Sequence, residues 1–497
     1  MKKHTRGVAP RRGVARAALS SALSLAWVAL VVAAPLAAAW VASSLAAHGG
    51  GSVRAAAASG LLVFPALPVL WEAASAWRRS RRAKPRPRVL TLVDRMVLRT
   101  LAVSLAFVGA LLARDPQGAF VALNSRGDWM LDGRHDARSE AARRRVFWLA
   151  ARSEWLYHLT DENPFHAGAT RRPPPPRPSP SPAFAAPSPA GARPVAEAPA
   201  EPPPEAPRDA RAWPWPAEMH PAVRALPAAA ETSPEAVGRY LAAQERDPWR
   251  LALAVHDYVA DRVEYDVPSY RAGVYPPQDA VTTFRTRRSV CAGYAALFEA
   301  IGRAAGLTVE TVVGRARGVV SEGMGEGHAW SAVKLDGRWR LVDTTWDAGY
   351  VSADGFHKRY RTEYFLTPPE VFLVKHFPDE ARWQLVATPW SAGEYMRAPT
   401  LDPGFFAAGM RLAAPSRAES DARGFVDVVI ENPRRRSVLV DVSADGGARL
   451  RCPLSGGDTV TARCALTGRD LHAVTIFVAP RRGETHWSVG SLRVHNR

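Results

Sequence analysis

The stretch RSVCAGYAALFEAIGRAAG, residues 288–306, places a cysteine at the start of an apolar helix. Apolar residues recur at helical spacing after Cys291, and Gly306 follows the last of them, which is typical of a helix that ends just before a glycine. A thiol in the first turn meets unpaired backbone N–H groups and the positive end of the helix dipole, and both favour the thiolate. Because the thiolate is the nucleophilic form, the sequence predicts that Cys291 is reactive.

The stretch HAWSAVKLDGRWRLVDTTWDAGY, residues 328–350, predicts a β-hairpin that carries a histidine and an aspartate. Asp336–Gly337 is a strong signal for a two-residue turn. With the turn at these two residues, Trp330 faces Asp343, and His328 lies on the same face one diagonal step away. A carboxylate beside an imidazole fixes its tautomer and stabilises its cation. The helix and the hairpin together therefore predict a nucleophile, a base and a residue that orients the base.

Three motifs around these residues resemble the transglutaminase-like superfamily. They are RSVCAGYAALF (288–298), GHAW (327–330) and GRWRLVDTTWDAG (337–349). The stretch TEYFLTPPEVFLVKHFPDEARWQL, residues 362–385, is similar more specifically to the kyphoscoliosis-peptidase branch of that superfamily. The resemblance covers residues 234–385, about a third of the chain.

This resemblance implies an α+β papain/transglutaminase-like catalytic domain, which we expect over residues 218–396. Carried onto the matching positions, it makes Cys291 the nucleophile, His328 the base and Asp343 the residue that orients His328. Asp347 departs from the pattern, because that branch more usually has a small residue after the tryptophan. We expect this change to have little effect on the triad, although substrate access could differ.

Two aromatic residues are candidates for supporting roles. In the superfamily, an aromatic residue upstream of the cysteine helps to hold the oxyanion alongside the backbone N–H of the cysteine. Tyr265 is the candidate for that role here, although a packing tyrosine at a helix end fits the sequence equally well. Trp346 closely follows Asp343 and is therefore expected near the site. Nothing in the sequence points to a metal or an organic cofactor.

The net charge of +18 comes largely from two basic clusters. Six lysines and arginines fall in residues 1–16 and seven in residues 78–88, and both clusters border apolar stretches. That pattern is typical of the cytoplasmic flanks of membrane helices. A nucleic-acid-binding protein would instead gather its basic residues on one folded face, and no nucleic-acid motif is present. The charge pattern therefore predicts an integral membrane protein with no nucleic-acid partner.

Residues 1–114 are expected to form a membrane region with two or three transmembrane helices, at about 17–47, 55–77 and 96–113. Arg99 interrupts the third segment and could snorkel to the interface. Positive-inside counting places the N-terminus in the cytoplasm. Three spans then place the rest of the chain on the periplasmic or extracellular side of the cytoplasmic (inner) membrane, which is our prediction, whereas two spans would leave it in the cytoplasm.

The remaining segments differ in texture. They are a polar, partly helical juxtamembrane segment (115–168), a Pro/Ala-rich disordered linker (169–217) and an immunoglobulin-like β-sandwich (397–497). Cys452 and Cys464 in the last segment could pair as a disulfide in an oxidising compartment or remain two thiols.

Together these features predict a membrane-anchored thiol enzyme that acts on peptide or glutamine-type amide bonds through an acyl-enzyme thioester. Its substrate would be a protein or peptide. The similarity to the kyphoscoliosis-peptidase branch favours hydrolysis over amine cross-linking. The alternative is a catalytically silent transglutaminase-like protein that binds or scaffolds in the cell envelope, which the long linker and the sandwich also fit. The sequence does not indicate an oligomeric state.

Overall fold

The computed structural model describes most of the chain and divides it into two compact units. The described residues are 11–81, 89–134, 136–159, 163–165, 213–318, 323–444, 447–468 and 471–496. The first unit comprises Met1–Glu162, Arg317–Gly325 and Ala387–Arg497. The second, which we call the central unit, comprises Asn163–Ala316 and Glu326–Val386. Most of the predicted linker, residues 169–212, lies outside the described residues.

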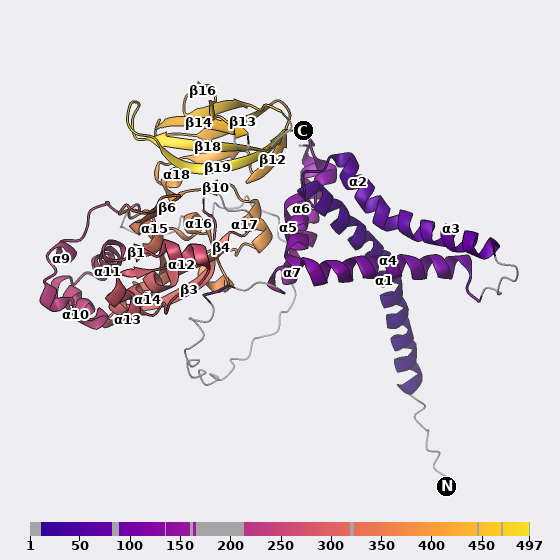
Figure 1. The fold of residues 1–497 in the computed structure, drawn as a ribbon, viewed down its shortest axis with the longest axis horizontal. Helices are drawn as coiled ribbons and strands as arrows, with labels where there is room; N and C mark the ends of the chain where they lie inside the picture. The colour runs from indigo at the N-terminus through magenta and orange to yellow at the C-terminus, as the bar shows by residue number, and fades with distance from the viewer. Residues whose placement is uncertain are drawn as a thin grey trace, which may run out of the picture. The chain divides into compact units, whose positions relative to one another are not determined.

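The first unit begins with helices that are long and apolar enough to cross a membrane (Figure 1). Three such spans are present in the described residues, at Ser24–His48, Val53–Ser80 and Leu92–Arg114. The helices are α1 (Arg11–His48), α2 (Val53–Leu61), the π-helical turn η1 (Leu62–Ala66), α3 (Leu67–Ser80) and α4 (Leu92–Arg114). The third predicted segment is thus a helix of spanning length, as the three-span prediction requires.

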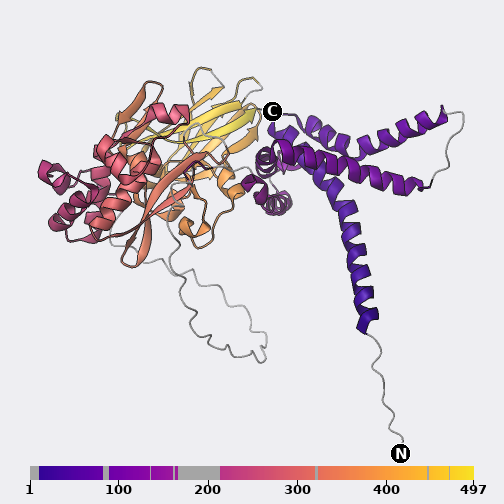
Figure 2. The ribbon, with the colours of Figure 1, turned by 60° about the horizontal axis from the view of Figure 1, so that its bottom comes forward.

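Charged residues inside these helices pair with one another. The Glu72 carboxylate of α3 accepts a hydrogen bond from Arg95 of α4 at 2.9 Å and another from Arg99. Figure 2 shows α3 and α4 running side by side. An isolated charge in an apolar environment is costly, and pairing reduces that cost. Arg99, which could also have reached the membrane surface, therefore contacts an acid on the neighbouring helix.

Short helices and a β-sandwich complete the first unit. The helices are α5 (Pro116–Arg126), η2 (Trp129–Leu131), α6 (Ala137–Ala151), α7 (Glu154–His158), α17 (Ala392–Arg397) and α18 (Pro403–Ala407). One sheet has the order β10-β19-β18-β14-β15, with β12 also paired to β19, and the other has the order β11-β13-β17-β16. The strands are β10 (Thr400–Leu401), β11 (Arg411–Ala414), β12 (Glu419–Ala422), β13 (Phe425–Glu431), β14 (Ser437–Ala444), β15 (Leu450–Arg451), β16 (Leu454–Gly456), β17 (Thr459–Ala465), β18 (Leu471–Ala479) and β19 (Trp487–Asn496).

The sandwich follows from alternation in its sequence. Every second residue of β13 and of β14 is buried, so each strand presents one face to the core. Cys452, just after β15, forms a disulfide with Cys464 of β17. The sequence Asp445–Gly446–Gly447 predicts a turn, but residues 445 and 446 lie outside the described residues.

The central unit is an α+β fold with a five-stranded antiparallel sheet of order β8-β5-β4-β3-β9 and two two-stranded sheets, β1-β2 and β6-β7. Its strands are β1 (Glu264–Tyr265), β2 (Arg288–Ser289), β3 (Thr308–Ala316), β4 (Glu326–Leu335), β5 (Arg338–Val342), β6 (Gly349–Ser352), β7 (Gly355–Lys358), β8 (Phe365–Thr367) and β9 (His376–Pro378). Its helices are α9 (Pro221–Arg224), η3 (Ala228–Ala230), α10 (Pro234–Gln244), α11 (Pro248–Arg262), α12 (Val267–Ala272), α13 (Ala280–Thr286), α14 (Cys291–Ala304), α15 (Thr344–Ala348), α16 (Pro369–Phe372) and η4 (Ala381–Gln384).

Helices α11 and α14 pack together and against the sheet to form the main core. Asp247 caps α11 by accepting hydrogen bonds from the backbone N–H groups of Trp249 and Arg250, and proline occupies the first helical position. The apolar face of α11 meets Leu297 and Phe298 of α14, which are fully buried. Each such buried side chain contributes about 1.5–3 kcal/mol. The packing fixes the start of α14 relative to the sheet.

The two stretches that dominate the sequence fold as predicted. Helix α14 begins at Cys291 and is followed by Gly306 in the left-handed region at φ +89°. The β4–β5 hairpin turns at Asp336–Gly337, where both residues have positive φ. Leu335 pairs with Arg338, so the predicted register is confirmed.

Candidate active site

Helix α14, strand β4 and the start of α15 bring the three predicted catalytic residues together. Cys291 is the first residue of α14, and its sulfur interacts electrostatically with His328 of β4. His328 Nε2 lies 2.7 Å from Asp343 Oδ2. Because Nε2 faces Asp343, Nδ1 is the ring nitrogen left for the sulfur of Cys291. The arrangement runs from thiol to imidazole to carboxylate.

The Asp343 carboxylate is fully buried and accepts four hydrogen bonds. Oδ1 caps α15 by accepting from the backbone N–H groups of Thr345 at 2.9 Å and Trp346 at 3.2 Å. Oδ2 accepts from His328 and from a second histidine, His376 Nε2, at 3.0 Å. Burial favours the neutral carboxyl, but the charge of His328 and these hydrogen bonds hold the pKa of Asp343 well below its ordinary value.

The surroundings of His328 favour its protonated form. Burial disfavours its cation, but the Asp343 carboxylate and the Cys291 sulfur outweigh burial and raise the pKa of His328 to about 10. An imidazolium between a carboxylate and a sulfur is the form that stabilises a neighbouring thiolate.

His376 was not singled out from the sequence. It lies on β9, is fully buried, and donates Nε2–H to Asp343. Burial and the positive charges of His328 and Lys375 lower the pKa of His376 to about 4, so its ring is neutral at ordinary pH. It stands within the stretch that resembles the kyphoscoliosis-peptidase branch, but only the pairing of β9 with β3 shows that it reaches the site.

Comparisons with known proteins agree with this geometry. The profile of the transglutaminase-like superfamily matches residues 235–344, which include all three residues of the arrangement. Residues 235–344 are a transglutaminase-like domain.

Two curated relatives place the domain in the kyphoscoliosis-peptidase-like branch. Kyphoscoliosis peptidase of Mus musculus is 34% identical over 172 residues, which cover 33% of this chain and 26% of the relative. The Homo sapiens protein is 38% identical over 136 residues, covering 25% and 20%. The chain therefore matches about a quarter of the length of these relatives. A solved crystal structure of a TGase matches at 20% identity with a TM-score of 0.20, covering 27% of this chain and 35% of that one.

Aromatic rings surround the two histidines that contact Asp343. The Trp346 ring lies 5.4 Å from His328 and 4.6 Å from His376, between ring centroids. Phe372 stacks on His376 at 4.1 Å, and Trp330 lies 5.2 Å from it. These rings exclude water from the Asp343 hydrogen bonds, and in a less polar surrounding those bonds are stronger.

Tyr265 packs in the apolar cluster around Cys291. Burial and the charge of Cys291 raise the pKa of Tyr265 above its ordinary value, so its hydroxyl stays protonated and can donate a hydrogen bond. The residue before Cys291, Val290, provides no side-chain cap to the first turn of α14. A backbone N–H of that turn and the Tyr265 hydroxyl are the donors from which an oxyanion site could be built.

Asp347 bonds with residues of the core. It is fully buried and lies 3.1 Å from His256 Nε2 of α11, while His256 Nδ1 lies 3.0 Å from Asp257. Burial disfavours the His256 cation, but hydrogen bonds and charge from Asp257 and Asp347 outweigh it and raise the pKa of His256 to about 9. The Asp347 carboxylate also accepts the backbone N–H of Tyr364. This network ties α15, which Asp343 caps, to the core helix α11.

The atoms around Asp343 are also of the kinds that bind metals. Ligand atoms of His328, Asp343 and His376 lie within 4.8 Å of one another. Two imidazole nitrogens and a carboxylate suit zinc or iron. However, both nitrogens lie at hydrogen-bond distance from one carboxylate oxygen, so donated N–H groups account for the arrangement. The absence of a metal stays a prediction.

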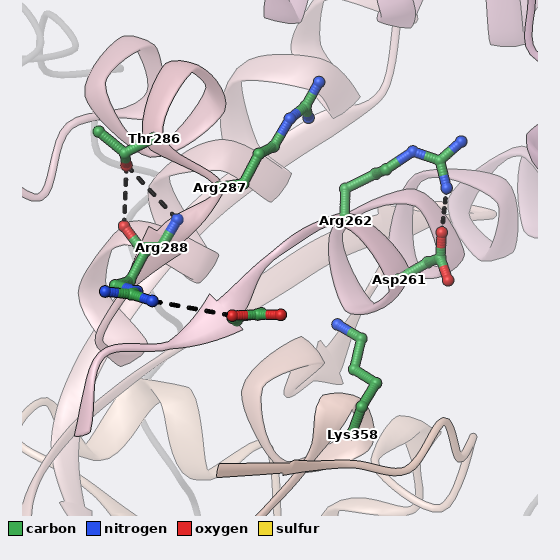
Figure 3. A pocket seen from close by; sticks show the side chains of 7 residues that line it. Asp261, Arg262, Thr286, Arg287, Arg288 and Lys358 are labelled. Carbon is green, nitrogen blue, oxygen red and sulfur yellow. Dashed lines mark hydrogen bonds and ion pairs between the residues drawn. The ribbon is translucent and has the colours of Figure 1, made fainter. Parts of the chain in front are cut away.

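A separate hollow of about 450 Å³ lies elsewhere on the central unit (Figure 3). Its lining is Asp261, Arg262, Glu264, Thr286, Arg287, Arg288 and Lys358, and includes none of the triad. Arg262 pairs with Asp261, Arg287 with Glu231, and Arg288 with Glu264. Since carboxylates neutralise these guanidinium groups, we assign no chemistry to this hollow.

The raised pKa of His256 predicts a loss of stability in mild alkali. Its contribution is complete below the unfolded-state pKa of about 6.5 and is lost as pH rises through about 9. Over that window the free energy of unfolding should fall by about 2–3 kcal/mol more in the wild-type chain than in His256→Gln. Thermal unfolding midpoints of the full-length chain across this pH range measure the difference. Equal slopes would contradict the network.

His376 should act through Asp343. His376→Phe removes one hydrogen bond to a charged group and should slow alkylation of Cys291 roughly tenfold at neutral pH. In an Asp343→Asn background the same change should have little further effect, because the carboxylate it supports is gone. His376→Gln, which keeps a side-chain N–H, should recover part of the rate. An equal effect of His376→Phe in both backgrounds would rule out action through Asp343.

Proposed function

We propose that this chain is a membrane-anchored thiol enzyme that acts on peptide or glutamine-type amide bonds. Its catalytic residues are Cys291 as nucleophile, His328 as acid and base, and Asp343 as the residue that orients His328. The single observation that carries the proposal is His328, which interacts electrostatically with Cys291 and is hydrogen-bonded to an Asp343 that is itself held by three further donors. The superfamily match over residues 235–344 supports it.

The chemistry follows from the positions of these groups. The Cys291 thiolate attacks the carbonyl carbon of the amide, and the carbonyl oxygen becomes an oxyanion held by the donors at the start of α14 and by Tyr265. The imidazolium of His328 gives its proton to the leaving amine, and the C–N bond breaks to leave a thioester on Cys291. His328, now neutral, takes a proton from the acceptor that attacks the thioester, and the thiolate is released.

The acceptor decides the class of enzyme. Water gives hydrolysis, and a primary amine gives a cross-link. The curated relatives in this branch are named peptidases, which favours water. The imidazolium of His328 serves both reactions equally. Whether the enzyme hydrolyses or cross-links therefore depends on which acceptor reaches the thioester.

The helices of the first unit would anchor the enzyme in the cytoplasmic membrane. Three spans place the two ends of the chain on opposite sides, and the basic residues at 1–16 favour a cytoplasmic N-terminus. The Cys452–Cys464 disulfide supports an oxidising compartment for the rest. We therefore propose that the catalytic residues lie on the periplasmic or extracellular side.

The ion pair predicts an unusual alkylation profile. For the full-length chain in detergent, the rate of Cys291 alkylation should reach its plateau well below the ordinary thiol pKa of about 8.5. His328→Ala should restore ordinary titration, so that near pH 6 it reacts roughly a hundredfold more slowly. Cys291→Ala is the control for background labelling, since Cys452 and Cys464 are paired.

The same samples test the reaction itself. Model peptide amides should be hydrolysed by the wild-type chain and by neither variant, and incorporation of a fluorescent primary amine in place of hydrolysis would make the enzyme a cross-linking acyltransferase. Ordinary titration in the wild-type chain, unchanged in His328→Ala, would exclude a working triad and favour the binding or scaffolding role.

The third span should determine on which side of the membrane the catalytic residues lie. In a bacterial host, a C-terminal alkaline phosphatase fusion should be active, because that enzyme works only outside the cytoplasm. Deletion of Leu92–Arg114 leaves two spans and should abolish phosphatase activity while a C-terminal fluorescent protein, dark outside, becomes bright. High phosphatase activity in both chains would contradict the proposed topology.

A further inference from the structure

The nucleophile is covered in this structure. Cys291 is only 1% exposed. The apolar cluster around it contains Val290, Ala295 and Ala329, which come from the transglutaminase-like domain, and one residue that does not, Phe165. Phe165 is 9% exposed, and its ring centroid lies 5.5 Å from that of Tyr275. A residue from outside the matched domain thus helps to close the cluster that buries the thiol.

The segment Asn163–Phe165 is fastened beside the catalytic histidine. Asn163 Nδ2 donates to the backbone oxygen of Gly314 at 2.8 Å, and Gly314 pairs with His328 in the β3–β4 ladder. Asn163 Oδ1 accepts the backbone N–H of Phe165 at 3.2 Å, which folds the segment so that the ring turns into the cluster.

Gly327 leaves room for this segment. A Cβ at position 327 would lie 2.9 Å from Asn163 Oδ1 and 3.1 Å from Pro164 Cδ. Because residue 327 immediately precedes His328, the close approach takes place beside the catalytic histidine. The segment therefore occupies space that a substrate chain needs if it is to bring an amide to Cys291.

We propose that the place of the Phe165 ring is a substrate subsite for an aromatic or bulky apolar side chain next to the reacting amide, and that Asn163–Phe165 fills it as an internal mimic. The inference rests on Cys291 being the nucleophile. The segment binds as a peptide would, through a strand carbonyl and one buried ring. Because it is tethered, its effective concentration is high, and the enzyme stays latent until a substrate or partner displaces it.

Access and activation of Cys291 can be measured separately. In the full-length chain Cys291 is the free cysteine, since the other two of its three cysteines form the disulfide. Phe165→Ala should speed alkylation at least tenfold, and should do so in both the wild-type and the His328→Ala backgrounds, because it changes access alone. Phe165→Trp should remain slow. Phe425→Ala, at an exposed phenylalanine of β13, is the matched control and should not change the rate.

The factorial design separates the two proposals. If Phe165→Ala does not increase the alkylation rate in either background, the proposal that Asn163–Phe165 covers Cys291 is wrong, and the proposed triad is unaffected. If Phe165→Ala increases the rate in both backgrounds and His328→Ala has no effect on it, the proposed triad is wrong, and the proposal that Asn163–Phe165 covers Cys291 is supported. Asn163→Ala, outside the apolar cluster, should also expose the thiol, and it replaces Phe165→Ala if the latter does not keep the wild-type thermal midpoint.

A short peptide tests the chemistry of the subsite. In Phe165→Ala, the peptide N-acetyl-Asn-Pro-Phe-amide should protect Cys291 from alkylation, and N-acetyl-Asn-Pro-Ala-amide should not. Protection by the first peptide alone supports a subsite for an aromatic side chain. Equal protection by both, or protection by neither, overturns it.

Discussion

The carboxylate of Asp343 is the group on which the proposed catalytic arrangement depends. A buried carboxylate is costly unless its oxygens are satisfied, and here each oxygen accepts two hydrogen bonds. One oxygen begins helix α15 and the other joins two histidines from different strands. The same anion therefore organises backbone and side chains at once. The fixed charge then raises the basicity of His328, and His328 in turn lies beside the thiol at the start of α14.

A second buried group of charges supports the first. His256 lies between Asp257 and Asp347, and Asp347 is on the helix that Asp343 caps. An ion pair without solvent contributes little net stability, but breaking it leaves an uncompensated charge. The ion pair therefore favours a single position of α15 against the core. The two carboxylates at this short helix thus have different roles. Asp343 contacts His328, whereas Asp347 holds the helix to the core.

Local signals carried most of what could be predicted. The Asp336–Gly337 turn determined the hairpin register, and helical spacing after Cys291 determined where α14 begins. His376 lies 33 residues from Asp343 and His256 lies 91 from Asp347, and no periodicity relates such pairs. The sequence around a histidine in a short strand is the same whether the side chain packs in a core or donates a hydrogen bond to the aspartate that orients the base. Phe165 was missed for the same reason, because its partners come together only in the fold.

The double use of Asp343 changes what its presence says about relatives of this chain. A helix that begins at this position needs Asp, Asn or Ser there for its backbone, whether or not any chemistry takes place. A descendant that had lost its activity would still be selected to keep a capping side chain. Glutamate, one methylene longer, would not serve as that cap. The aspartate is therefore a poor indicator of activity across a lineage, and the cysteine and the histidine beside it, which cap nothing, are the positions where decay would first be visible.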